Sequence, residues 1–442
     1  MRARIAAVIV LNGVLSPGFA ADTWPQWRGA EMNGVSEAKN VPLEWSESTN
    51  VLWRVDLPAW GGATPIVWRD RVFVVSPSAA EETTEGGVTR RLPRMGRENP
   101  GGKELILFCI DAGDGKVRWQ HTLDHRNTLY GKQNMASPSP VTDGRHVWAL
   151  TGTGILTCLD FDGKVRWTAD LQKRVGDFQL MWGYASSPSL VGDTVVVQVL
   201  HGSAGPARSM LIAFKGETGD VVWEHERKTD ARAECPDAYT TPVLAKDGGR
   251  TELIVSGADY VTAHDPADGR ELWRSAGLNP SKEPNYRVCP SPVVVGDLVV
   301  AGSRVKPMIA VRLGGTGDVT ESRRAWALER GGPDVPSPVS DGKLLYVVND
   351  KGMVTCVDVR SGEVKWGPER TAVGTVSASP VLADGRIFVT NENAVTTVLA
   401  TGPEFKVLAT NELEDGYTIS SPAVVDGRIY IRTSRRLYCI GK

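Results

Sequence analysis

Residues 379–389 read SPVLADGRIFV and residues 421–431 read SPAVVDGRIYI, so the chain repeats one phrase with its prolines 42 positions apart. A small hydroxyl residue followed by proline recurs earlier in the chain and gives eight copies in all. The anchor prolines are Pro65, Pro140, Pro188, Pro242, Pro292, Pro338, Pro380 and Pro422. After a first gap of 75 residues they fall 42 to 54 residues apart, a period typical of propeller blades.

Each repeat continues with a turn, an alternating strand, a second turn and a tryptophan. Residues 160–167 read DFDGKVRW and residues 215–223 read KGETGDVVW, with glycine four positions before the tryptophan in both. Asp-Gly and Gly-Asp elements between alternating segments are hairpin turns, in which glycine accepts a positive φ. Each unit is therefore predicted to be a four-stranded antiparallel meander.

Stacking such meanders radially buries both faces of every sheet and leaves only short edges. The last repeat ends at Ile440 without an outer strand, whereas residues 51–57, VLWRVDL, precede the first anchor proline. We therefore predict an all-β, eight-bladed β-propeller of four-stranded antiparallel blades, closed by pairing of the N-terminal strand with the C-terminal blade. Large rings packed between neighbouring blades are predicted at Trp53, Trp119, Trp167, Trp223, Trp273, Trp326 and Trp366.

The first 20 residues have a basic start, an apolar run and small residues up to Ala20, which is typical of a secretory signal peptide. The predicted organisation is a signal peptide at 1–20, a lead segment at 21–50 and the propeller at 51–442. Loss of the two arginines in the signal peptide moves the formal net charge from −2 to −4, which argues against nucleic-acid binding. No later segment is typical of a membrane span, so we expect a periplasmic or secreted monomer.

The chain has six cysteines without CxxC or metal-ligand spacing. Four of them fall at one repeat position where other blades have alanine, which predicts a small buried packing site. They are Cys109, Cys158, Cys356 and Cys439. Equivalent positions in different blades are too far apart for the Cα separation of about 6 Å that a disulfide needs. Cys235 and Cys289 lie in loops that enter blades four and five, and their pairing is left open.

The repeats, with WPQWRG at 24–29 and NGVS at 33–36, resemble the pyrroloquinoline quinone (PQQ)-like repeat β-propellers. The resemblance implies one of two roles, because one fold hosts many activities. The outer-membrane assembly propeller lipoprotein is a non-enzymatic scaffold, and the quinoprotein alcohol dehydrogenases are more distant enzymes. The dehydrogenases carry adjacent cysteines and the lipoprotein a cysteine after its signal sequence. This chain has no neighbouring cysteines and has Ala20-Ala21-Asp22 at the cleavage region, which indicates a soluble exported relative.

Loops that enter the inner strands gather on one face of a propeller, around its central channel. Aromatic residues with a polar tip suit a pocket that is wet at one end. The predicted contacts there are Trp60, Trp182, Tyr184, Tyr239, Tyr286 and Tyr417, with Arg287 as a polar anchor. The alternative is that these rings wedge between blades. Insertions at 77–104 and 200–210 add basic residues that could bind an anionic ligand, but acidic residues beside them leave a merely solvated surface open.

Enzyme signatures are sparse. His121 and His125 have the spacing of helical metal ligands but lack the accompanying glutamate, and no GxSxG motif or P-loop is present. We predict no catalytic residues, no metal site and no cofactor. The expected function is an exported, non-catalytic propeller that binds a protein segment or small anionic ligand at its loop-rich face. The alternative is a PQQ-dependent oxidoreductase, which would need PQQ and oxygen ligands for calcium.

Overall fold

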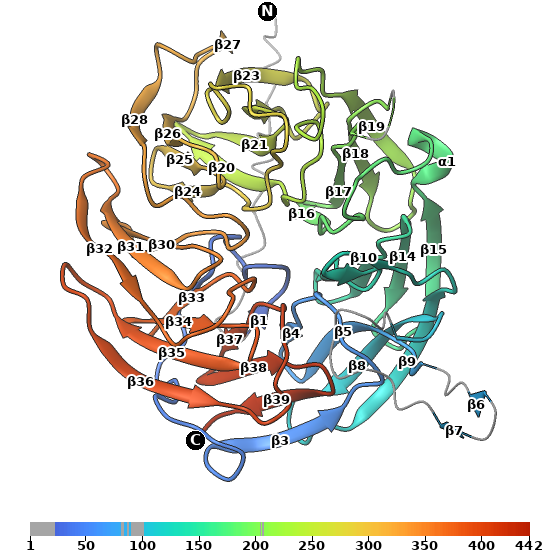
Figure 1. Cartoon of the computed structure of the whole chain (residues 1–442). Coiled ribbons are helices and arrows are strands. Elements are labelled where there is room, and N and C mark those ends of the chain that lie inside the picture. The colour runs from blue at the N-terminus through green and yellow to red at the C-terminus, as the bar shows by residue number, and fades with distance from the viewer. Residues whose placement is uncertain (1–22, 81–83, 86–87, 90–100, 204, 206) are drawn as a thin grey trace, which may run out of the picture.

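Eight sheets are arranged as blades around a central axis (Figure 1), which confirms the predicted β-propeller. A computed structural model of the chain describes residues 23–80, 84–85, 88–89, 101–203, 205 and 207–442. The predicted signal peptide and most of the insertion at 77–104 lie outside the described residues. Among the residues that are described, no helix has the length and apolar character that a membrane crossing requires.

The first four blades follow the chain order. From inner to outer strand they contain β4 (Ile66–Trp68), β5 (Arg71–Pro77), β8 (Leu105–Asp111) and β9 (Val117–Asp124); β12 (Val141–Thr142), β13 (His146–Leu150), β14 (Ile155–Asp160) and β15 (Val165–Asp170); β16 (Ser189–Val191), β17 (Thr194–Val199), β18 (Met210–Lys215) and β19 (Val221–Glu226); β20 (Val243–Asp247), β21 (Arg250–Gly257), β22 (Tyr260–His264) and β23 (Glu271–Ala276).

The last four blades continue the same pattern, and the final outer strand comes from the beginning of the chain. They contain β24 (Val293–Val295), β25 (Leu298–Ala301), β26 (Met308–Arg312) and β28 (Arg324–Leu328); β29 (Val339–Ser340), β30 (Leu344–Val348), β31 (Met353–Asp358) and β32 (Val364–Arg370); β33 (Val381–Ala383), β34 (Arg386–Thr390), β35 (Val395–Ala400) and β36 (Val407–Glu412); β37 (Ala423–Val425), β38 (Arg428–Arg432), β39 (Arg436–Ile440) and β3 (Val51–Asp56).

Short elements decorate the blades. Three strands extend existing sheets: β1 (Thr23–Trp24) pairs with β4, β2 (Val35–Ser36) with β33, and β27 (Gly317–Asp318) with β23. Two small hairpins, β6 (Thr84–Glu85) with β7 (Val88–Thr89) and β10 (Leu129–Tyr130) with β11 (Gln133–Asn134), and one short helix, α1 (Gln172–Val175), lie in the connecting loops.

The ring is closed by strands from both ends of the chain, as predicted. β3 runs antiparallel to β39, with Val51 opposite Ile440 and Asp56 opposite Arg436; Figure 1 shows blue β3 beside the red strands of blade 8. Trp53 on β3 donates its indole N–H to the carbonyl of Ala112 in blade 1, at 2.9 Å. Strand pairing and this bond therefore join the two ends to each other and to the first blade.

The blade tryptophans connect neighbouring blades by a repeated hydrogen bond. Six of the seven donate the indole N–H, at 2.8 to 3.0 Å, to a main-chain carbonyl of the next blade. The pairs are Trp53 with Ala112, Trp119 with Phe161, Trp167 with Gly216, Trp223 with Pro266, Trp326 with Val359 and Trp366 with Gly402. Trp273 instead donates to Glu252 in its own blade, where β27 covers the outer strand.

The repeated glycine lies under the tryptophan of the preceding blade. A Cβ added to Gly163 would lie 2.8 Å from the Trp119 ring, and one on Gly219 would lie 2.6 Å from Trp167. Both glycines also have positive φ, 84° and 77°. Five of the seven blade tryptophans have this glycine four positions earlier, and each of the five glycines serves both the turn and the contact between blades.

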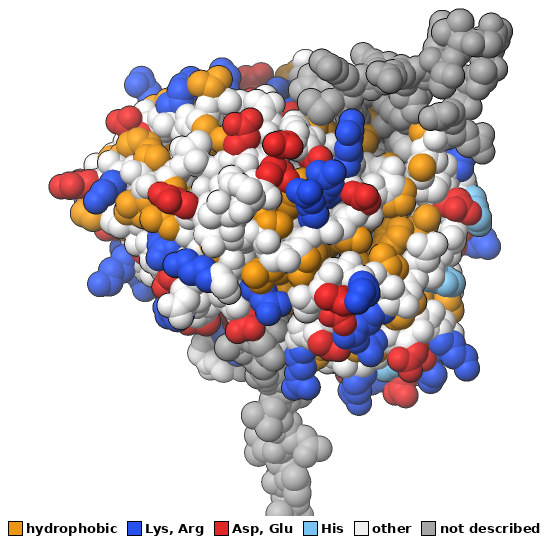
Figure 2. All heavy atoms as spheres, turned by 90° about the horizontal axis from the view of Figure 1, so that it is seen from below, with side chains coloured by type: hydrophobic (Ala, Val, Ile, Leu, Met, Phe, Trp, Pro, Cys, Tyr) orange, Lys and Arg blue, Asp and Glu red, His pale blue; other side chains and the backbone are white. Residues whose placement is uncertain are grey.

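All six cysteines are unpaired thiols. Cys109, Cys158, Cys356 and Cys439 are fully buried on the third strands of their blades, at the shared repeat position. On the side of the ring that Figure 2 shows, acidic and basic side chains are intermixed, with apolar side chains between them.

Candidate functional site

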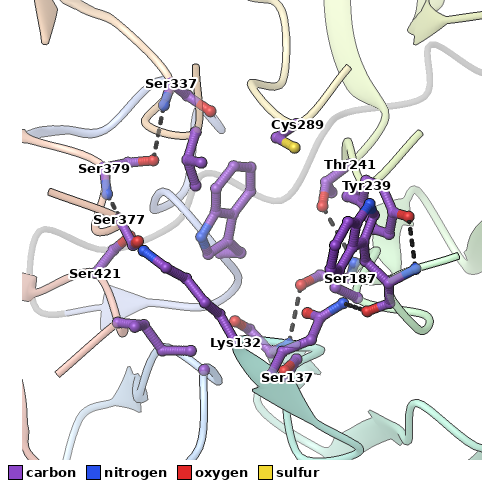
Figure 3. A pocket seen from close by; sticks show the side chains of 18 of the residues that line it. Lys132, Ser137, Ser187, Tyr239, Thr241, Cys289, Ser337, Ser377, Ser379 and Ser421 are labelled. Carbon is purple, nitrogen blue, oxygen red and sulfur yellow. Dashed lines mark hydrogen bonds between the residues drawn. The ribbon is translucent and has the colours of Figure 1, made fainter. Parts of the chain in front are cut away.

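Eight hydroxyl residues, each directly before an anchor proline, form a ring around the channel, which we call the hydroxyl ring. Its members are Thr64, Ser139, Ser187, Thr241, Ser291, Ser337, Ser379 and Ser421. The backbone N–H of each residue from Thr64 to Ser379 donates to the hydroxyl of the next one, at 2.8 to 3.1 Å. Figure 3 shows several of these bonds. The repeated Ser-Pro and Thr-Pro pairs therefore join the inner ends of the blades.

The hydroxyl ring is open at the seam between the last blade and the first. In the described part of the chain, the buried Thr64 hydroxyl has no hydrogen-bond partner. Other contacts close the seam: the Ser420 hydroxyl donates to the carbonyl of Ala63 at 2.9 Å, and buried Arg432 donates to the carbonyls of Val75 at 2.6 Å and Ala59 at 3.1 Å.

A cavity of about 410 Å³ lies in the channel. Six hydroxyl-ring residues line it, together with the residues two positions before each ring member. This second set, which we call the upper tier, consists of Gly62, Ser137, Ala185, Tyr239, Cys289, Val335, Ser377 and Ile419. Alternate residues of an extended segment point to the same side, so the two sets form successive layers. The hydroxyl ring is nearly constant between blades, whereas the upper tier varies and gives the cavity different walls.

The lead segment closes the end of the channel opposite the entering loops. Its Pro25 carbonyl accepts the N–H of Thr142 at 2.8 Å, and the Gln26 side chain accepts the N–H of Leu190 at 3.2 Å. Arg28 donates to the carbonyls of Ser337 and Pro338 in blade 6. These contacts hold Trp27, which lines the cavity as its floor. The WPQWRG motif is therefore a plug that spans several blades.

The β10–β11 hairpin lies over the open end of the cavity. Gln133 donates its side-chain amide to the carbonyl of Gly183 at 3.0 Å, and Gly131 packs against the ring of Trp182. Lys132, at the hairpin turn, extends across the cavity (Figure 3) and donates to Glu392 of blade 7 at 2.9 Å. The hairpin thus narrows the mouth and places an ammonium group at it.

Three predicted contact residues meet at this mouth. Trp182 donates its indole N–H to Glu234 at 2.9 Å, and Arg287 donates to the same carboxylate at 3.0 Å. The Arg287 guanidinium lies 5.2 Å from the centre of the Trp182 ring, a cation–π distance. The Tyr239 hydroxyl accepts a hydrogen bond from the backbone N–H of Trp182 at 3.1 Å, and burial raises the pKa of the Tyr239 phenol. Trp182, Tyr239 and Arg287 all line the cavity.

The other four predicted contacts lie inside the propeller. Trp60, Tyr184, Tyr286 and Tyr417 are all buried and are absent from the cavity lining. Trp60 and Tyr417 pack edge to face with centroids 5.8 Å apart, and Tyr184 donates its hydroxyl to the carbonyl of Gln198 at 2.7 Å. These rings occupy the inter-blade positions of the alternative interpretation.

The sequence analysis did not identify Trp27, Lys132, Gln133 or the upper tier. Trp27 was visible in the WPQWRG motif, and the upper tier stands three positions before each anchor proline, so both had a sequence signal. Lys132 and Gln133 belong to a hairpin without a counterpart in the other repeats, so the repeat pattern could not indicate them.

The cavity does not present a ligand set for calcium beside a quinone. Over the described residues, no group of three or more His, Cys, Asp and Glu side chains is arranged to hold a metal ion. The described cavity lining contains hydroxyls, aromatic rings, Lys132 and Arg287, but no carboxylate, and calcium prefers carboxylate and carbonyl oxygens.

Comparisons with known proteins agree with this architecture. The family model described as "Outer membrane protein assembly factor BamB" matches residues 103–368. The curated BamB of Yersinia pestis is 23% identical over 260 residues, which are 58% of this chain and 61% of that relative's length. The crystal structure of BamB from Moraxella catarrhalis superposes with a TM-score of 0.58 at 15% identity, covering 88% of this chain and 98% of that one.

Quinone enzymes have a similar fold. A europium-containing methanol dehydrogenase superposes with a TM-score of 0.67 at 13% identity, covering 96% of this chain and 98% of that chain. The quinohemoprotein alcohol dehydrogenase of Comamonas testosteroni gives 0.64 at 11% identity and covers 96% and 82% of the two chains. At such identities the solved structures show the fold alone.

Proposed function

Because the chain belongs to the family described as outer membrane protein assembly factor BamB, we propose that it is a non-catalytic propeller that binds a segment of a partner protein at the cavity mouth. The family model and the curated relative from Yersinia pestis are both named as an assembly factor, and we assign a comparable protein-binding role to this chain. We further propose that it acts in the periplasm as a monomer.

The observation that carries this proposal is a set of exposed apolar side chains at the mouth. Met181 is 51% exposed, Tyr130 42% and Trp182 39%. The hairpin and the loop lie against each other here, because a Cβ on Gly183 would lie 3.0 Å from the Tyr130 side chain and one on Gly131 would lie 2.7 Å from the Trp182 ring. We call Tyr130, Met181 and Trp182 the mouth patch. Contiguous exposed apolar surface of this kind marks interaction sites.

The mouth patch is also pre-organised. Trp182 is held by the Glu234 carboxylate, the Arg287 guanidinium and the Tyr239 hydroxyl, so little conformational freedom is left to lose on binding. Tryptophan beside arginine is the composition of interface residues that dominate binding energy. A protein segment laid across this patch would therefore gain affinity from a rigid aromatic anchor.

Site-specific photo-crosslinking in cells tests the proposal. A benzophenone amino acid at position 181 is expected to form a discrete adduct with a partner protein, and one at position 364 is not. Val364 is a matched control because it is 42% exposed on an outer strand, away from the mouth. Once the partner is purified, Trp182→Ala is expected to weaken binding by about 2 kcal/mol, roughly 30-fold in Kd, and Val364→Ala to leave it unchanged. Equal adducts at both positions would contradict the proposal.

The quinoprotein alternative is tested on the same purified protein. Addition of PQQ and calcium is expected to leave the melting temperature unchanged and to give no dye reduction with alcohols or sugars. A rise in melting temperature together with substrate-dependent dye reduction would replace the binding role with an oxidoreductase.

A further inference from the structure

We propose that the central cavity is an acceptor site for the free C-terminal carboxylate of the segment that the mouth patch binds. The inference rests on the proposed function and specifies which part of the partner is recognised. It follows from the hydrogen-bond donors, the charge and the closed shape of the cavity.

The hydroxyl ring supplies a circle of unused donors. Seven of its hydroxyl oxygens accept a backbone N–H from the neighbouring blade, and a hydroxyl group still carries one O–H donor. Within the described part of the chain, none of these seven donates to an acceptor. All seven side chains are buried, and six line the cavity: Ser139, Ser187, Thr241, Ser337, Ser379 and Ser421. A buried donor without an acceptor is costly, so the ring favours a ligand rich in acceptor oxygens.

Two basic side chains at the mouth can bind an anion. Lys132 and Arg287 line the cavity, whereas their partners Glu392 and Glu234 do not. Asp334 also interacts with both cations but is not part of the cavity lining. An ammonium has three N–H donors and a guanidinium has five, and in the described structure each of these two side chains uses one group to bind its glutamate. Arg287 also interacts with the Cys289 thiol, so the Lys132 ammonium, with two further N–H donors, is the group that can bind a carboxylate by charge-assisted hydrogen bonds.

The shape favours the end of a chain. Trp27 closes the cavity at the bottom, so a segment cannot pass through it, and Trp182 belongs to both the mouth patch and the cavity lining. A segment that crosses the patch can therefore turn its last residue into the cavity. Tyr239, Val335 and Ile419 add apolar surface to the cavity from three different blades, which suits an apolar terminal side chain, while the hydroxyl ring and Lys132 accept the carboxylate. Capture of a chain-terminal carboxylate is a recurring mode of peptide recognition.

The test compares two peptides that differ only at the last atom group. The probe is an N-terminally fluorescein-labelled hexapeptide, Gly-Ser-Gly-Ser-Val-Phe, as the free acid and as the C-terminal amide, titrated against the full mature protein by fluorescence polarisation. The free acid is expected to bind at least tenfold more tightly than the amide. Equal affinities of acid and amide would overturn the inference.

Variants assign the effect to the cavity. Lys132→Gln removes the charge but keeps a polar side chain, and the acid-to-amide ratio is expected to fall toward one. Ala185→Trp fills the cavity from the upper tier and is expected to abolish binding of the acid, with the melting temperature confirming a folded protein. A tenfold ratio that survives both substitutions would overturn the inference, because the carboxylate would then bind elsewhere.

Failure of the inference and failure of the proposed function give different results. If Trp182→Ala abolishes partner binding while the acid and amide peptides bind with equal affinity, the mouth patch binds a segment but the cavity does not recognise its C-terminal carboxylate. If partner binding is unchanged both by Trp182→Ala and by Ala185→Trp, the proposed function fails as well.

N-acetylphenylalanine is a third ligand for the same titration. If it binds as tightly as the hexapeptide acid, the cavity binds a small free carboxylate, and recognition of a chain end is overturned.

Discussion

A buried histidine in blade 4 and a buried arginine directly after the outer strand of blade 3 both hydrogen-bond to one threonine. Arg227 donates to the Thr262 hydroxyl at 2.8 Å, and the Nε2 atom of His264 lies 2.9 Å from the same oxygen. The Nδ1–H group of His264 donates to the carbonyl of Gly269 at 3.0 Å. Burial, with the nearby Arg227 charge, lowers the pKa of His264 to about 3, so the imidazole is neutral near pH 7 and its Nε2 atom accepts a hydrogen bond from the Thr262 hydroxyl.

His264 predicts a loss of stability in acid. Between its ordinary pKa of 6.5 and the folded value of about 3, the unfolded chain binds a proton that the folded protein does not. The free energy of unfolding is therefore expected to fall as pH falls through this window, by up to about 1.4 kcal/mol per pH unit from this residue. Denaturant titrations at several pH values give the free energy of unfolding as a function of pH, and this free energy should change less steeply with pH in His264→Gln than in the wild type. The exposed His125→Gln is the control, and identical slopes for wild type and His264→Gln would refute the assignment.

At the scale of the element, two turn glycines with similar backbones are expected to differ: Gly219 precedes the outer strand of blade 3, and Gly385 connects the first two strands of blade 7. Gly219 has a φ of 77° and lies under Trp167, while Gly385 has a φ of 71° and nothing within 4 Å of an added Cβ. Gly385→Ala is expected to cost about 1–2 kcal/mol for the backbone alone. Gly219→Ala adds overpacking of about 1–3 kcal/mol. Urea unfolding measures both, and equal losses would show that the contact between blades does not constrain this turn.

The same elements show what the sequence could predict. The spacing of prolines, glycines and tryptophans predicted the blades and the closing strand because each repeat carries its own turn and packing signals. The site was harder, since neighbouring residues of an entering loop face opposite ways. Tyr239, two positions before Thr241, faces the cavity, whereas Tyr184, three positions before Ser187, packs within the blades. Counting from the anchor proline would have separated these two; the β10–β11 hairpin that places Lys132 follows no repeat and had no such signal.

At the scale of the whole molecule, the ring depends on its last strand. β39 connects β38 to β3, so its removal leaves the N-terminal strand without a partner and the seam open. Truncation after Ser434 is expected to abolish cooperative unfolding and to make the protein sensitive to protease. Removal of Lys442 alone is the control, because it leaves all β39 pairings in place. A protease-resistant product from the longer truncation would mean that seven blades and the lead segment suffice.

The pairing of β3 with β39 also joins two strands that are synthesised at very different times. Asp56 and its partner Arg436 are separated by 380 positions, and ribosomes add roughly 5–20 residues per second. At these rates β39 is therefore synthesised roughly 20–80 s after β3. The ring can therefore close only after the whole chain has been synthesised, so the last residues added decide when β3 is paired.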